Sequence, residues 1–161
     1  MAGKELAPGA TGARTMKNLR RLRGEMTYAE LSRRLEALGR PIPPLGLRRI
    51  EAGERRVDVD DLMALALVLR VSPLALLLPH GEHSDSSSEL GNGEVRNDEL
   101  WQWAIGERPL DDHDSRRFQA ASLPPWLEIR SLTSNIGRGA VPIREFDQWW
   151  DGTARDPSGD S

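Results

Sequence analysis

The chain has 161 residues, of which 38% are hydrophobic and 29% charged, so it can bury one core of ordinary size. It contains no cysteine, which excludes a disulfide framework and any thiolate zinc site, and its formal charge is −3. Its apolar stretches are too short to span a bilayer, so we expect a cytoplasmic protein without membrane contact.

The charge is divided unequally along the chain. Residues 1–79 hold 14 Lys and Arg against 9 Asp and Glu, whereas residues 80–161 hold 8 against 16. All five tryptophans lie in the second, acidic part. We therefore expect the two parts to have different partners, and the basic part has the sign of charge that nucleic acid requires.

The first elements are indicated by composition, spacing and capping residues. Residues 1–12 are rich in Gly, Ala and Pro and are expected to form a loose arm. From Met16 onward, apolar residues recur at helical spacing, which predicts a first helix ending at Gly24. Thr27 has the position of an N-cap for a second helix, and Glu30 completes a capping box.

Three further helices follow a proline-rich turn. Pro44 is suited to the first turn of a third helix, and Gly53 to its C-terminal end. Asp58 is placed to cap a fourth helix, which is apolar nearly all round and is therefore expected to be buried. Ser72 begins a short fifth helix. Leucine-rich inner faces on five short helices predict an all-α domain over residues 13–79.

The sequence changes in character beyond this domain. Residues 80–94 contain Gly, Ser, Asp and Glu with almost nothing apolar, so we expect a flexible linker. Residues 95–150 are acidic, contain the tryptophans and are expected to be partly helical, over 97–105 and 115–123. Residues 151–161 are expected to be disordered.

Three segments of the first domain together indicate a family. They are Thr27 to Ser32, which opens the second helix, Ile50-Glu51-Ala52-Gly53, which closes the third, and Val71-Ser72-Pro73, which opens the fifth. With this combination, residues 15–79 resemble the Cro/phage-repressor (XRE-type) helix-turn-helix family of bacterial transcriptional regulators. The resemblance implies a five-helix, lambda-repressor-like DNA-binding domain whose third helix lies in the major groove.

The resemblance also implies roles for individual residues. Pro44, Leu45 and Arg49 match positions that face base edges, where the first two offer apolar contact and Arg49 can donate to guanine O6 and N7. For Arg49, a phosphate contact or a solvated side chain remains an alternative. The DNA-binding set is Tyr28, Pro44, Leu45, Gly46, Arg48, Arg49, Arg55 and Arg56, with Tyr28, Arg48, Arg55 and Arg56 as expected phosphate contacts.

One further pair is implied to be structural. Arg23 and Glu51 match two positions that pair in this family and hold the first helix against the recognition helix. Their expected role is to orient the third helix, and they are not expected to contact bases.

Other candidate sites carry weaker signals. His80, His83 and His113 are too sparse a ligand set for a closed zinc site, and the acidic residues among 111–114 lack a calcium-loop pattern. The sequence contains no phosphate-binding glycine loop, nucleophile elbow or HExxH motif. We expect no enzyme activity, cofactor or metal.

These observations predict a sequence-specific, repressor-like transcriptional regulator that binds double-stranded DNA. We expect a homodimer, because one helix that reads about four base pairs cannot find its site in a genome. The acidic C-terminal region is a candidate surface for a protein partner. Two alternatives remain: a protein-interaction module, indicated by the apolar Pro44-Leu45-Gly46 edge, and an antitoxin whose acidic tail masks a toxin.

Overall fold

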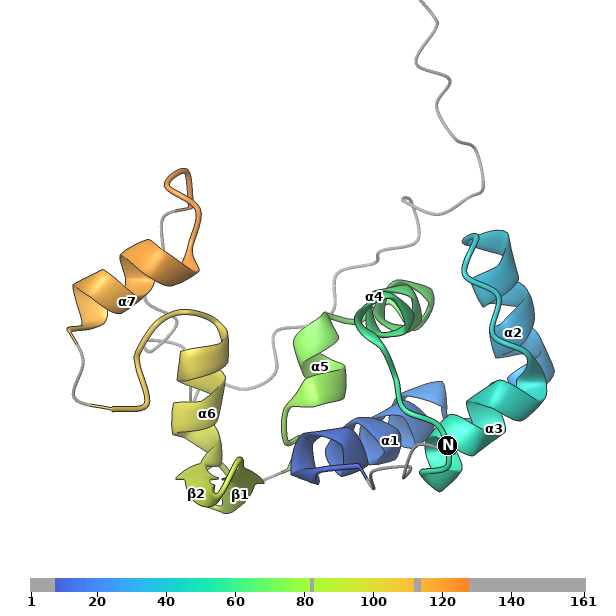
Figure 1. Cartoon of the computed structure of the whole chain (residues 1–161), viewed down its shortest axis with the longest axis horizontal. Coiled ribbons are helices and arrows are strands. Elements are labelled where there is room, and N and C mark those ends of the chain that lie inside the picture. Colours follow the sequence, from blue (N-terminus) through green and yellow to red (C-terminus); the bar gives the residue numbers. More distant parts are fainter. Residues whose placement is uncertain (1–7, 82, 112–113, 128–161) are drawn as a thin grey trace, which may run out of the picture. The chain divides into compact units, whose positions relative to one another are not determined.

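A computed structural model describes residues 8–81, 83–111 and 114–127. Over these residues the protein is mostly helical, with one small two-stranded sheet (Figure 1). Among them, no helix is both long enough and apolar enough to cross a membrane. The expectations for 1–7 and for 128–161, including the disordered tail and Trp149 and Trp150, lie outside the described residues.

The first part of the chain forms the five expected helices. They are α1 (Ala10–Arg23), α2 (Tyr28–Ala37), α3 (Pro44–Ala52), α4 (Val59–Val68) and α5 (Pro73–Leu77). The predicted caps are present, since the side chains of Thr27, Asp58 and Ser72 each accept a hydrogen bond from a backbone N–H of the helix that follows. Gly53 ends α3 in the left-handed conformation, with φ of 81°.

The core of this part is made mainly of leucine and isoleucine from all five helices and from the turn before α3. Ile42 in that turn is as deeply buried as the helical residues, although it is flanked by prolines. The fully buried side chains are Leu19, Leu31, Leu35, Ile42, Leu47, Ile50, Leu65 and Leu76. Burial of Leu47 and Ile50 fixes which face of α3 is turned inward.

Two expectations for these helices are corrected. α1 begins at Ala10, inside the expected arm. Its first turns have no apolar periodicity that would indicate a helix, and polar contacts hold them instead: Arg14 donates to the carbonyl oxygens of Leu77 and Glu89. α4 is not buried all round, because Met63 and Leu67 are exposed on the side opposite the core. A bundle of this size covers one face of such a short helix and leaves the other face uncovered.

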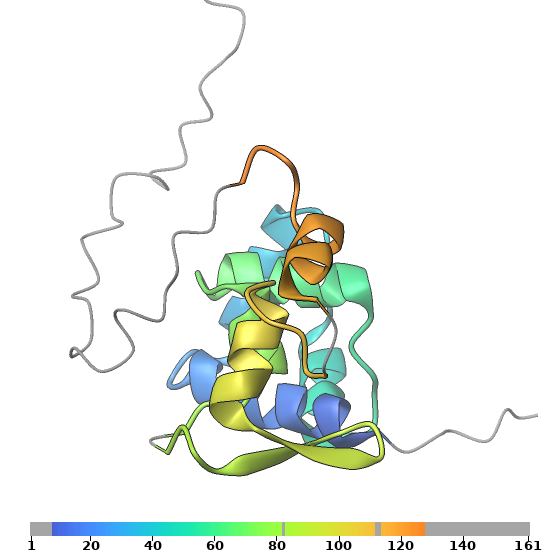
Figure 2. The ribbon, with the colours of Figure 1, turned by 90° about the vertical axis from the view of Figure 1, so that its left-hand side faces the viewer.

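A β-hairpin occupies most of the expected linker and corrects that expectation. Strands β1 (Ser87–Leu90) and β2 (Gly93–Arg96) pair antiparallel, with Leu90 opposite Gly93 (Figure 2). Gly91 begins the two-residue connection with φ of 62°, a conformation that glycine adopts without steric cost in hairpin turns. The sequence signal was this glycine followed by Asn92, and it was masked by the polar composition around it.

Two helices follow the hairpin, as the sequence predicts. They are α6 (Asn97–Ala104) and α7 (Ser115–Ser122). Leu100 of α6 is fully buried, and the indole nitrogen of Trp101 donates to the carbonyl oxygen of Pro79 at 2.9 Å. α6 therefore contacts the segment that directly follows α5.

Candidate nucleic-acid interface

The candidate interface is built on α2, a proline-rich turn and α3. The turn is anchored at its centre, because the Ser32 hydroxyl on α2 donates to the carbonyl oxygen of Ile42 at 2.7 Å. Pro43 is extended, and Pro44 begins α3 at a position where no backbone N–H is required. The direction in which α3 leaves the turn is thus fixed by one buried side chain and two prolines.

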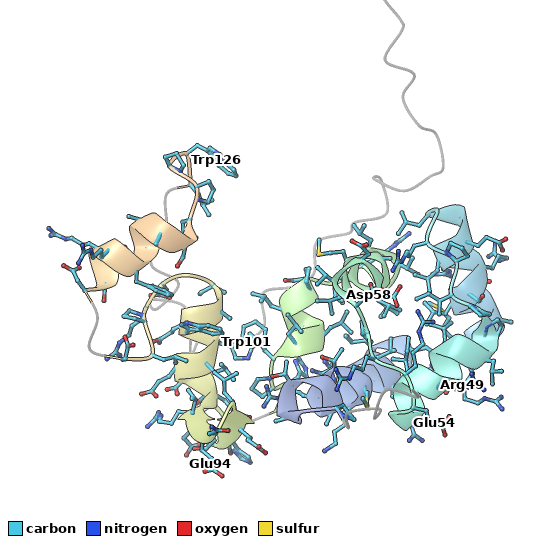
Figure 3. The ribbon with its side chains drawn as sticks, viewed as in Figure 1. Arg49, Glu54, Asp58, Glu94, Trp101 and Trp126 are labelled. Carbon is cyan, nitrogen blue, oxygen red and sulfur yellow. The ribbon has the colours of Figure 1, made fainter. Side chains whose placement is uncertain are left out.

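Most of the residues predicted on the outer face of α3 are exposed. Pro44, Leu45, Arg48 and Arg49 all lie at the surface, and Leu45 retains 57% of its accessible area. Residues three and four positions apart share one side of a helix, so Leu45, Arg48 and Arg49 form a common face. Figure 3 shows Arg49 on this helix, with Glu54 just beyond the end of α3.

Gly46 does not belong to that exposed face, although the sequence placed it among the DNA-binding residues. It is buried, and a Cβ atom added to it would lie 2.9 Å from Nη1 of Arg55 and 3.2 Å from Cγ2 of Ile42. Gly46 follows Leu45 by one position, and successive helical residues point about 100° apart, which turns Gly46 inward.

The predicted pair between Arg23 and Glu51 is present. Nε and Nη2 of Arg23 donate to the two carboxylate oxygens of Glu51 at 2.7 and 3.1 Å, and the Glu51 side chain is only 6% exposed. The fork-to-fork geometry fixes both the distance and the relative orientation of the two groups. It connects the end of α1 to the last turn of α3.

Tyr28 completes this arrangement, which we call the Glu51 cluster (Arg23, Tyr28 and Glu51). The Tyr28 hydroxyl donates to Oε2 of Glu51 at 2.8 Å, and the Arg23 guanidinium lies 4.3 Å from the centre of the Tyr28 ring. The one hydroxyl proton of Tyr28 is therefore used within the protein, whereas the sequence expectation assigned it to a phosphate. Arg48 lies 5.7 Å from the same ring and remains exposed.

The cluster shifts the pKa values of its members in the directions expected for a charged network. Burial raises the pKa of Glu51, but hydrogen bonds from Arg23 and Tyr28 outweigh it and hold that pKa below its usual value. The hydrogen bond to Glu51 raises the pKa of Tyr28, and burial adds to this. Both shifts favour an ionised Glu51 and a neutral Tyr28 at neutral pH.

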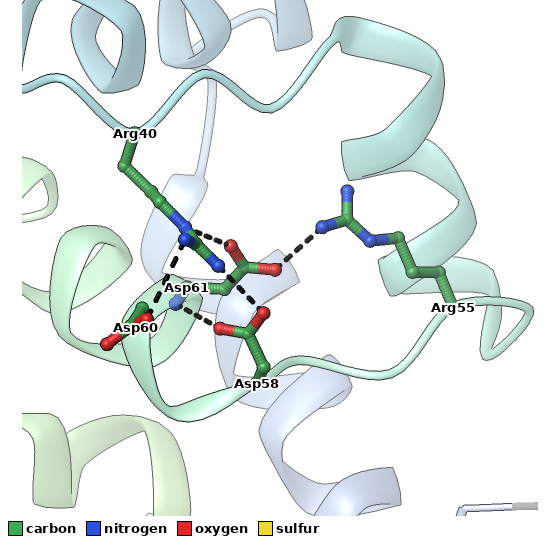
Figure 4. Close-up of polar contacts among 5 residues, drawn as sticks. All are labelled: Arg40, Arg55, Asp58, Asp60 and Asp61. Carbon is green, nitrogen blue, oxygen red and sulfur yellow. Dashed lines mark hydrogen bonds and ion pairs between the residues drawn. The ribbon is translucent and has the colours of Figure 1, made fainter.

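A second network, which the sequence reasoning missed, connects α4 with the segments before and after α3. We call it the Asp61 cluster (Arg40, Arg55, Asp58 and Asp61), and Figure 4 shows its members. Nε of Arg40 donates to Oδ1 of Asp61 at 2.9 Å, and Nη2 of Arg55 donates to Oδ2 at 2.7 Å. Asp61 is only 1% exposed, and its two arginine partners are about one-third exposed, at 38% and 37%.

Asp58 has two functions in this cluster. Its Oδ1 accepts from the backbone N–H of Asp61 at 2.7 Å, which caps α4, and its Oδ2 accepts from Nη2 of Arg40 at 2.7 Å. That backbone hydrogen bond is the main reason why the pKa of Asp58 lies below its usual value. The sequence predicted the cap correctly, but the partner Arg40 lies in the turn before α3 and no local pattern relates the two.

The remaining predicted contacts can now be placed. Arg55, expected at a phosphate, is engaged with Asp61, whereas Arg56 is exposed. Within the described residues, no three His, Asp or Glu side chains are grouped so that they could hold a metal ion, and His113 is not among those residues. The residues that form the candidate face are thus Pro44, Leu45, Arg48 and Arg49.

Comparisons of the chain with protein-family models, with curated proteins and with solved structures gave no match.

Proposed function

We propose that the protein is a sequence-specific DNA-binding transcriptional regulator with a lambda-repressor-like domain, and that α3 enters the major groove. One observation carries this proposal. The exposed face of α3, with Leu45, Arg48 and Arg49, belongs to a helix whose last turn is held by a nearly buried ion pair. A rigid helix that presents cations and an apolar side chain on one face suits groove recognition.

The positions of the two arginines support different roles for them. Successive residues of a helix point about 100° apart, so Arg48 and Arg49 cannot both meet the same base pair. Arg48 lies on the side of α2, near the Tyr28 ring, where a helix N-terminus and its free N–H groups suit a phosphate. Arg49 is therefore the candidate for bidentate donation to guanine, and Leu45 for contact with a thymine methyl group.

The charge of the first domain supports the same partner. Residues 1–79 hold 14 Lys and Arg against 9 Asp and Glu. Binding as a homodimer would double the contacted sequence and produce two half-sites about ten base pairs apart, centre to centre, or a multiple of that spacing.

Selection of bound sequences from a random double-stranded DNA pool, using the full chain, tests the proposal. We expect an inverted-repeat consensus. Arg49→Ala should cost about 1–3 kcal/mol on that site and relax the preference at one base pair. Arg116→Ala, an exposed arginine on α7 with the same loss of charge, is the matched control and should leave the consensus unchanged.

The outcomes separate this function from its alternatives. If no sequence is enriched and binding to random DNA does not weaken with salt, DNA recognition is excluded, because phosphate contacts release counterions. A protein-interaction module is then the second candidate, favoured by the exposed apolar side chains of Leu45, Met63 and Leu67.

A further inference from the structure

We propose that Arg55 is a positioning residue for the first turn of α3, acting from the Asp61 cluster, and that it does not contact phosphate. The inference rests on the proposed function, because it concerns how α3 reads bases. It replaces the expectation, drawn from the sequence, that Arg55 binds the DNA backbone.

The guanidinium group of Arg55 lies between α3 and α4. Its Nη2 donates to Oδ2 of Asp61 on α4 at 2.7 Å. Its Nη1 lies so close to Gly46 that a Cβ atom on this residue would be 2.9 Å away. Gly46 lies in the first turn of α3, so the guanidinium is packed directly against the backbone of that turn.

A single carboxylate holds the segments on both sides of α3. Oδ1 of Asp61 accepts from Arg40, in the turn that leads into α3, and Oδ2 accepts from Arg55, just beyond the end of α3 (Figure 4). Asp61 is 1% exposed, so the departure of either arginine would leave its buried negative charge partly uncompensated. This opposes the transfer of Arg55 to a phosphate.

A fixed position of the first turn of α3 matters most for residues that contact bases only through apolar side chains. Pro44 and Leu45 are the exposed residues of the first turn, and neither side chain can donate a hydrogen bond to a base. Van der Waals contact with a thymine methyl group weakens within about 1 Å, so these residues depend on the exact placement of the helix. Arg49, a long side chain in the half of α3 held by the Glu51 cluster, depends on it less.

The test uses the full chain and the random-pool selection described above, with three variants. Leu45→Ala identifies the base pairs that the first turn reads. Arg55→Ala removes the guanidinium that lies between Gly46 and Asp61. Gly46→Ala displaces this guanidinium, and to a smaller extent Ile42, without changing any charge. We expect both to lose about tenfold of the preference at the Leu45-dependent base pairs and to keep the preference that depends on Arg49.

Salt dependence and thermal unfolding distinguish this from other roles. The slope of log affinity against log salt should be unchanged in Gly46→Ala and in Arg55→Ala. If Arg55→Ala weakens all sequences equally and lowers the slope by about one, Arg55 is a phosphate contact and the inference is wrong. A lower melting temperature with an unchanged base preference would reduce Arg55 to a purely structural residue and would also overturn the inference.

Two controls keep the test decisive. If Arg55→Ala does not fold, Arg55→Lys keeps a cation opposite Asp61 but lacks the planar group that lies against Gly46, and it should show the same loss of preference. If the wild-type chain itself enriches no DNA sequence, the proposed function fails. If the wild type enriches a sequence and the variants show the same base preferences, only the inference about Arg55 fails.

Discussion

The two ends of α3 are held by clusters of different construction. At the last turn, Glu51 accepts from Arg23 and Tyr28, and the carboxylate and the guanidinium are both largely removed from solvent. At the first turn, Asp61 is buried but its two arginine partners remain about one-third exposed. The first arrangement has one cation and one neutral donor for its anion, whereas the second has two cations.

This difference predicts different consequences of breaking each cluster. Removing Glu51 leaves Arg23 beneath neighbouring side chains with no anion. Removing Asp61 leaves Arg40 paired with Asp58 and lets the partly exposed Arg55 move into water. We therefore expect the Glu51 cluster to contribute more to the free energy of unfolding. The Asp61 cluster should contribute more to the placement of the first turn.

The largest effect is expected for Glu51→Ala. Loss of one member of a buried pair costs about 3 kcal/mol or more, because the partner charge is left uncompensated. The free energy of unfolding from urea titration followed by circular dichroism measures it. Glu54→Ala, an exposed carboxylate just beyond α3, is the matched control and should change little (Figure 3). Equal stability of the two variants would contradict the assigned burial of the pair.

Asp61→Ala is expected to have the next largest effect. It removes two charge-assisted hydrogen bonds to arginines that can be solvated, so we expect a loss of about 2 kcal/mol. Asp60→Ala has the same change of charge on the neighbouring residue. The Asp60 side chain is 81% exposed and makes only a long, 3.7 Å ion pair with Arg40, so its loss should cost well under about 1 kcal/mol. A loss in Asp61→Ala as large as that in Glu51→Ala would remove the distinction between the two ends of α3.

Much of this architecture is predictable from the sequence because its signals are local. Thr27, Asp58 and Ser72 cap helices by bonding to residues two or three positions away, and Gly53 ends α3 by its own backbone conformation. Helical periodicity likewise identifies Leu47 as buried. Such signals do not depend on the rest of the fold.

The β-hairpin had a local signal, Gly91 followed by Asn92, which the polar composition around it hid. The other parts that were not predicted depend on pairs distant in sequence. Arg40 and Asp61 are separated by 21 positions, and each alone is an ordinary charged residue. The packing of the Arg55 guanidinium against Gly46 is likewise indicated by no local pattern. The Arg23–Glu51 pair is more distant still, at 28 positions, and only the family resemblance predicted it.

The pH dependence of stability should distinguish the two clusters further. Glu51 has a pKa below its unfolded value, so its contribution is fully present above about pH 4.5 and is lost as the pH falls through the folded pKa. The stability difference between wild type and Glu51→Gln should therefore be constant from about pH 6 to 5 and shrink as the pH falls from about 4.5 to 3, as measured by urea titration at each pH. A difference that is constant over this range would mean that Glu51 titrates normally in the folded protein.

The smallest effect is expected for Tyr28→Phe, which removes only the third component of the Glu51 cluster. The ring remains beneath the Arg23 guanidinium, but Oε2 of Glu51 loses the hydrogen bond from the hydroxyl, so we expect a cost of about 1 kcal/mol. Because that hydroxyl donates to Glu51, affinity for DNA should change no more than stability explains. Parallel measurement of unfolding and of binding to the selected site tests this. Unchanged stability with weaker binding to every sequence would mean that the hydroxyl leaves Glu51 for a phosphate in the complex, and that the last turn of α3 is held by Arg23 alone.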